Sequence, residues 1–85
     1  MKVIIPSALR SYTERGEVEA SGTTLAAVLA DLDQRYPGIR FRMIDEQQQM
    51  RPHIRFFLDG EQLRELSRPL RASGELIIVQ ALSGG

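Results

Sequence analysis

Two glycines, Gly84 and Gly85, stand at the last two positions of the 85-residue sequence and offer its clearest chemistry. A terminal carboxylate on a segment without side chains can thread a channel too narrow for any other residue. A frayed terminus or a cloning scar would give the same two residues, so the elements before the pair must decide its meaning.

The other residue types exclude most alternative chemistry. The sequence has no cysteine, which removes disulfides, thiolate zinc sites, iron–sulfur clusters and cysteine nucleophiles. His53 is the single histidine, so a multi-histidine metal site is excluded, and with no visible triad partner we interpret it as a surface residue. We therefore expect no bound metal or cofactor, and a function that resides in a surface, a terminus or a partner.

The composition is typical of one soluble domain. Hydrophobic residues make up 42% and charged residues 26%. The 11 basic and 11 acidic residues balance, which argues against a nucleic-acid partner, because such binders neutralise phosphates. The longest apolar stretch, residues 25–30, is far short of a membrane span, and the start of the chain lacks a signal-peptide core. We expect a cytoplasmic protein with no membrane partner.

Local patterns predict one main helix and a set of short strands. Apolar residues at helical spacing predict a helix over 25–36, with Thr24 as its N-cap and Pro37 ending it. Residues 7–9 are interpreted as a continuation of the first strand, and 39–53 as a short helical turn followed by a loop. The predicted strands cover residues 2–5, 17–21, 54–58, 62–64 and 75–80.

This order of elements predicts how they pack. A hairpin leads into one amphipathic helix, which must bury its apolar stripe on one face of a sheet. The last strand is a continuous apolar run, so it should be central and should pair with the first strand through a crossover. The expected fold is α+β, a β-grasp (ubiquitin-like) domain over 1–80 with a mixed four- to five-stranded sheet on one main helix. Residues 81–85 are expected to form a flexible tail.

Period-two alternation also predicts a docking surface. If Val3, Phe56 and Leu76 face the helix, then Ile4, Phe57 and Ile77 point away from it. Such an apolar outer patch usually marks an interaction site, which Pro6 and Leu82 would extend toward the tail. Two other interpretations stay open, namely cover by long arginine side chains such as Arg55 and a homodimer through this face. Leu58, Ile5 and Ile78 complete the set predicted to face the helix.

The second half of the chain is rich in arginine. An acidic partner or a phosphate would suit these residues, but acidic side chains lie between them in the sequence, which favours a solvated mixed face. The arginines are Arg51, Arg55, Arg64, Arg68 and Arg71, and the interleaved acids are Asp59, Glu61 and Glu65.

Nearly the whole chain resembles the ubiquitin-like sulfur carriers of the MoaD/ThiS family, which include the molybdopterin synthase small subunit and the thiamine and cysteine-biosynthesis carriers. The resemblance is carried by the start Lys2 to Pro6 with Leu9-Arg10, and by the run from Gly74 to Gly85. Residues 51–63 look closest to the cysteine-pathway carriers. The chain departs from the family pattern at Glu75, where aspartate is frequent, and at Gln80, where proline is common.

The resemblance implies a carrier rather than an enzyme. A ubiquitin-activating-type adenylyltransferase would adenylate Gly85 with ATP and Mg²⁺, which the partner uses. A sulfur donor would then leave a C-terminal thiocarboxylate that passes sulfur to an acceptor synthase in a molybdopterin, cysteine or thiamine pathway. Leu82, Ser83 and Gly84 would form the tail that enters the partner, and the chain could act as the small subunit of such a synthase.

Two other functions remain open at this point. A protein modifier would be conjugated to lysines through Gly85, and it would be adenylated in the same way. A non-covalent β-grasp adaptor would bind a partner without using Gly85. The pathway, the sulfur donor, the acceptor and the oligomeric state are not written in the sequence.

Overall fold

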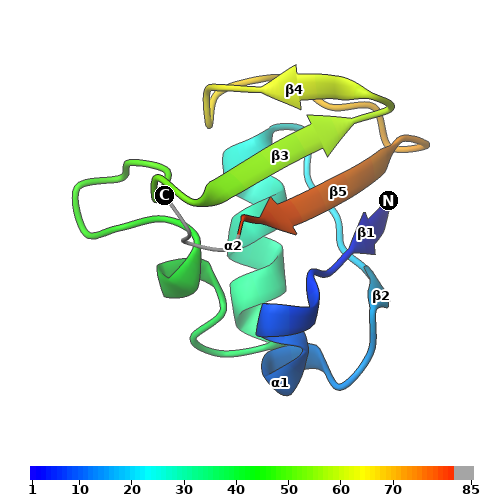
Figure 1. Ribbon diagram of the computed structural model, residues 1–85. Coiled ribbons are helices and arrows are strands. Elements are labelled where there is room, and N and C mark those ends of the chain that lie inside the picture. The colour runs from blue at the N-terminus through cyan, green and yellow to red at the C-terminus, as the bar shows by residue number, and fades with distance from the viewer. Residues whose placement is uncertain (82–85) are drawn as a thin grey trace.

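Five strands form one mixed sheet in the computed structural model, which describes residues 1–81 (Figure 1). The strand order is β2-β1-β5-β3-β4, with β1 and β5 parallel neighbours and the other three pairs antiparallel. The predicted β-grasp arrangement, which required the first and last strands to be adjacent and parallel, is confirmed. The strands are β1 (Lys2–Ile4), β2 (Glu17–Glu19), β3 (Ile54–Leu58), β4 (Glu61–Leu63) and β5 (Glu75–Gln80).

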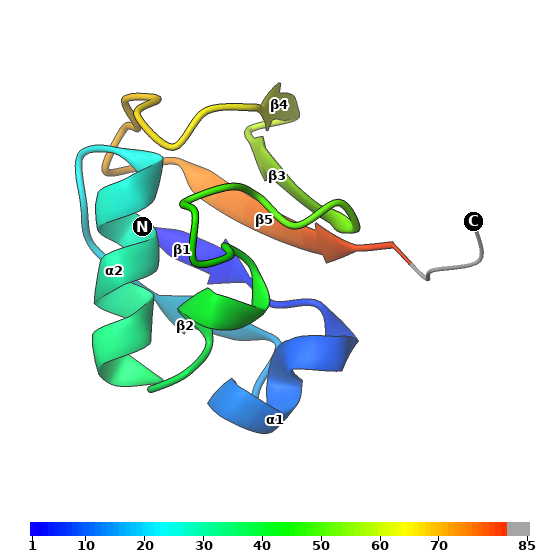
Figure 2. The same cartoon turned by 90° about the vertical axis from the view of Figure 1, so that its left-hand side faces the viewer.

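The main helix, α2 (Leu25–Arg35), lies against one face of this sheet (Figures 1 and 2). Thr24 is its N-cap, as predicted, because the Thr24 side chain accepts a hydrogen bond of 3.1 Å from the Ala27 amide. The helix ends one residue earlier than expected, since Pro37 disfavours helical geometry at Tyr36, where φ is −135° and ψ is 80°. The helix residues that are fully buried are Leu25, Val28, Leu29 and Leu32.

The Thr24 cap gives a first testable expectation. Thr24→Ala removes the acceptor for the Ala27 amide and should lower the free energy of unfolding by about 1 kcal/mol, measured in urea. Thr23→Ala is the matched control, because Thr23 is exposed and contributes its backbone carbonyl, not its side chain, to the bond with Leu70. An equal loss in both variants would show that the hydroxyl of Thr24 does not stabilise the helix.

The segment after β1 corrects one expectation from the sequence. Residues 7–9 do not continue the strand; they form a 3-10 turn, η1 (Ser7–Leu9), which leads into the short helix α1 (Arg10–Thr13). The last bond of the β1–β2 hairpin runs from the Ile5 amide to the Gly16 carbonyl at 2.8 Å. Position 6 faces the other edge of β1, toward β5, where proline has no N–H to extend the pairing. The turn instead directs Leu9 into the core, where its side chain is buried.

Residues 39–53 are a helical turn and a loop, as predicted, but they contribute more to the core than their mixed spacing indicated. The turn η2 (Arg40–Arg42) is flanked by Ile39, Met43 and Ile44, which are all fully buried. Phe41, within the turn, is 54% exposed. The segment therefore closes the core with one side and presents an aromatic ring with the other.

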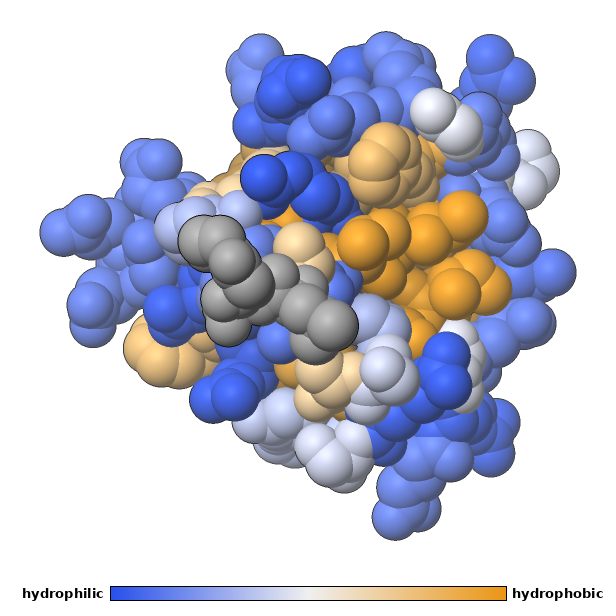
Figure 3. All heavy atoms as spheres, viewed as in Figure 1, coloured by the Kyte–Doolittle hydropathy of each residue, from blue (hydrophilic) through white to orange (hydrophobic). Residues whose placement is uncertain are grey.

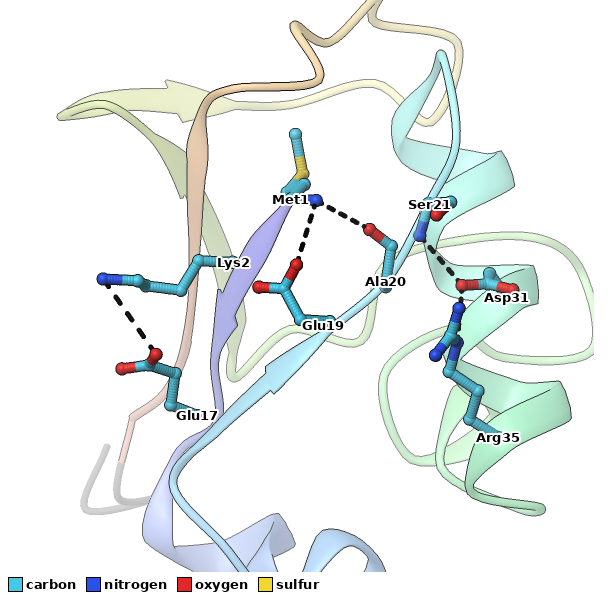
Figure 4. A network of polar contacts seen from close by, with 8 residues as sticks. All are labelled: Met1, Lys2, Glu17, Glu19, Ala20, Ser21, Asp31 and Arg35. Atoms are coloured by element: carbon cyan, nitrogen blue, oxygen red, sulfur yellow. Dashed lines mark hydrogen bonds and ion pairs between the residues drawn. The ribbon is translucent and has the colours of Figure 1, made fainter.

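Polar contacts join the start of the sheet to the helix (Figure 4). The amino group of Met1 donates to the Ala20 carbonyl at 3.0 Å, and the Ser21 amide donates to Asp31 Oδ2 at 2.8 Å. Arg35 Nε lies 2.9 Å from the same oxygen.

The Ser21 amide first, and then Arg35, hold the pKa of Asp31 below its ordinary value. This contribution to stability is present above the ordinary pKa and is lost as the pH falls through the lowered one.

Candidate functional site

The outer face of the sheet carries the predicted apolar row. The register pairs Ile4 of β1 with Ile77 of β5, and Ile77 with Phe57 of β3, so the three residues form one line across the central strands. All three are half-buried, whereas the residues that alternate with them, such as Val3 and Leu76, are fully buried. In Figure 3 a hydrophobic area lies over these strands on the side away from α2.

Val79 extends this row toward the end of β5, and the sequence interpretation missed it. Its side chain is 37% exposed, and it is two residues beyond Ile77, which is the spacing that keeps both on one face. Period two alone would have found it. Pro6 follows β1 in the same direction and is half-buried. We call Ile4, Phe57, Ile77 and Val79 the apolar face.

Charged side chains border the apolar face without capping it. At one end, Lys2 Nζ lies 3.7 Å from Glu75 and 4.0 Å from Glu17. At the other end, Arg55 pairs with Val79 in the register, but its guanidinium donates back to the carbonyls of Pro52 and Ile54. Arg55 therefore extends toward the start of β3, so the arginine cover considered from the sequence is not formed by this side chain.

The apolar face leads to the point where the tail begins. Gln80, the last residue of β5, pairs with Ile54, and the Ala81 amide donates to the His53 carbonyl at 2.8 Å. The chain is thus held on β3 as far as Ala81. The predicted tail residues lie outside the described residues, and they are Leu82, Ser83, Gly84 and Gly85.

The described part of the chain lacks the side-chain cluster that a metal site would need. Within residues 1–81 no group of three or more His, Asp or Glu side chains could hold a metal ion. No buried side-chain N or O atom in that range lacks a hydrogen-bond partner, and no helix there is long and apolar enough to cross a membrane. The arrangement can present a surface and a terminus to a partner.

A family model assigns the chain. The model of the ThiS family matches residues 3–85, which is almost the full sequence and includes the diglycine end. The chain belongs to the ThiS family. The MoaD/ThiS resemblance seen in the sequence is therefore confirmed.

Individual relatives agree with this assignment. The ThiS-family chain is 33% identical to the sulfur carrier protein CysO of Mycobacterium tuberculosis over 98% of its own length and 96% of that protein. It matches the crystal structure of the Amycolatopsis orientalis BexX/CysO complex with a TM-score of 0.91 and 30% identity, covering 99% of this chain and 98% of the other.

A third relative bears a different description. The small archaeal modifier protein 1 of Methanosarcina acetivorans has a TM-score of 0.80 and 27% identity, over 99% of this chain and 94% of that one. All of these matches span nearly whole chains. The prediction of a ubiquitin-like carrier fold is confirmed, and the relatives named as CysO are carriers rather than enzymes.

Proposed function

We propose that this protein is a sulfur carrier whose reactive group is the carboxyl of Gly85. The observation that carries the proposal is the family match, which extends through residue 85 and so includes both terminal glycines. The fold supports it, because β5 delivers the chain to Ala81 beside an apolar face that a partner can cover.

Direct replacement of a carboxylate oxygen by sulfur is difficult, so the proposed reaction has two steps, adenylation and then displacement of AMP. A Gly85 carboxylate oxygen attacks the α-phosphorus of ATP, and pyrophosphate leaves, which gives an acyl adenylate with a good leaving group. A sulfide-level donor then forms a C–S bond to the carbonyl carbon as the C–O bond to AMP breaks. The product is a thiocarboxylate, and no electrons are gained or lost. ATP, Mg²⁺ and the catalytic side chains belong to the activating enzyme.

We propose two protein partners for this cycle. The first is a ubiquitin-activating-type adenylyltransferase that docks on Ile4, Pro6, Phe57 and Ile77. The second is a synthase that accepts the sulfur. The relative that was solved in a complex with BexX supports the existence of a protein partner. Similarity to CysO favours an acceptor of the cysteine type over molybdopterin or thiamine. The cytoplasm is the proposed compartment, since no cysteine needs an oxidising one.

The matched modifier protein favours one second candidate, conjugation of Gly85 to protein lysines. Both functions begin with the same adenylate and differ in the nucleophile that attacks it. A sulfur nucleophile gives the carrier, and a lysine amine gives an isopeptide bond. The two are separated by the product, not by the activation step.

The test is the chemical state of the protein after production beside its activating enzyme. A carrier should gain the mass of one oxygen replaced by sulfur. Because oxidation of one of the 3 methionines gives nearly the same gain, the sample is also treated with iodoacetamide. The chain has no cysteine, so alkylation at the C-terminus reports the thiocarboxylate. A larger lysine-linked adduct would support the modifier, and an unmodified terminus would leave the non-covalent adaptor.

A further inference from the structure

A hollow of about 290 Å³ lies beside the point where β5 ends. Within it, Arg51 stacks on the exposed ring of Phe41, with the guanidinium carbon 4.6 Å from the ring centroid. Arg51 Nε donates to the Phe41 carbonyl at 2.7 Å, which fixes the orientation of the guanidinium. The residues that line the hollow are Phe41, Arg42, Arg51, His53 and Gln80.

This part of the surface carries uncompensated positive charge. Arg42 and Arg51 line the hollow, and Arg55 lines a neighbouring hollow together with Arg51. We call these three arginines the basic cluster. They form no ion pair with any acidic side chain in residues 1–81, where all the aspartates and glutamates of the chain lie. By contrast, Arg68 pairs with Glu61. None of the acids interleaved with the arginines in the sequence is ion-paired with the basic cluster.

The basic cluster can bind carboxylates in a defined way. Because Nε of Arg51 is engaged, its two terminal nitrogens are left to donate to both oxygens of one carboxylate. The ring of Phe41, 54% exposed, offers an apolar contact next to that charge. The surface fits an acidic segment that also carries an apolar side chain.

The short tail forces a partner onto this surface. Four residues follow Ala81, and they span at most about 13–14 Å when fully extended. An enzyme that receives Gly85 must bring its channel within that distance of Ala81. Two surfaces adjoin Ala81. The apolar face reaches it at Val79, and the hollow reaches it at Gln80. An enzyme whose channel opens near Ala81 must therefore cover both the apolar face and the hollow.

We propose that the basic cluster and Phe41 bind an acidic segment beside the tail channel of the enzyme that adenylates Gly85. This inference rests on the proposed function. The activating enzyme is the partner chosen because both the carrier and the modifier require it. The balanced charge of the whole chain argues against a nucleic acid as the occupant of this surface.

The test compares two charge reversals in pyrophosphate exchange catalysed by the activating enzyme. Arg42→Glu should raise the KM for the carrier about tenfold at low salt with kcat unchanged, and the difference should shrink as salt rises. Arg71→Glu is the control, because it makes the same change in net charge and Arg71 is exposed just before β5, at the opposite end from Ala81. Its KM should stay within about twofold.

Each outcome decides the proposal. Equal increases in both variants would show that net charge alone matters, and no increase for Arg42→Glu would show that the cluster does not contact this enzyme. If Arg42→Glu left pyrophosphate exchange unchanged and impaired only the later transfer of sulfur to the acceptor, the basic cluster would contact the acceptor. That result would overturn its assignment to the activating enzyme. Arg42→Gln, with about a threefold increase expected, guards against a folding defect from the reversed charge. A wild-type chain that supports no exchange would reject the proposed function itself.

Discussion

Deletion of Gly85 is expected to abolish adenylation while leaving the fold unchanged. The deletion leaves a carboxylate on Gly84 that is withdrawn by about 3.3–3.6 Å of extended chain. A nucleophile and an electrophile must approach within about 3–3.5 Å to react, so this shortfall removes the reactive geometry. The measurement is exchange of pyrophosphate into ATP by the cognate activating enzyme.

The matched variant has one residue added after Gly85. It should also fail in exchange, because the terminal carboxyl is displaced and the new end carries a side chain unless the added residue is glycine. Neither change alters residues 1–81, so the thermal midpoint of unfolding should hardly move. If the shortened protein supports exchange as well as the full-length one, the diglycine is a frayed end and the adaptor interpretation replaces the carrier.

Phe57→Ala is expected to weaken binding to the activating enzyme by about 2 kcal/mol, or roughly 30-fold in Kd. Phe57 lies in the middle of β3 and next to Ile77, so its ring is central to the apolar face, where interface aromatics contribute most. Because the ring is half-buried on the outer face and Phe56 fills the core, the variant should keep its fold. Titration calorimetry with the activating enzyme measures the change.

Gln62→Ala provides the comparison for Phe57. Gln62 lies in the edge strand β4 and pairs with Phe57 of β3. The Gln62→Ala variant therefore tests whether the loss of binding is specific to the apolar face or is shared by the whole outer surface. A polar rim residue should change Kd less than about threefold. Unchanged binding by Phe57→Ala would remove this face from the activating interface. A collapsed fold in that variant would show that the ring is part of the core.

Local patterns in the sequence determined the elements and their faces. The alternation in β3 and β5 separates Phe56 and Ile78, which are buried, from Phe57 and Ile77, which are not, because successive side chains in a strand point to opposite sides. The helix start was readable for a similar reason, since the N-cap bond of Thr24 spans three residues. The terminal Gly84-Gly85 pair is also evident from the sequence, and the family match through residue 85 connects the pair with the ThiS family.

Tertiary structure decided what depends on contacts between distant residues. The turn at Ser7–Leu9 forms where Pro6 cannot extend the pairing of β1 with β5 and where Leu9 is buried in the core, neither of which is a property of those three residues alone. The arginines interleave with acids along the chain, yet folding pairs Arg68 with Glu61 and leaves Arg51 stacked on Phe41 beside the end of β5. Charge balance in a sequence is an average, whereas a surface field depends on which side chains the fold brings together.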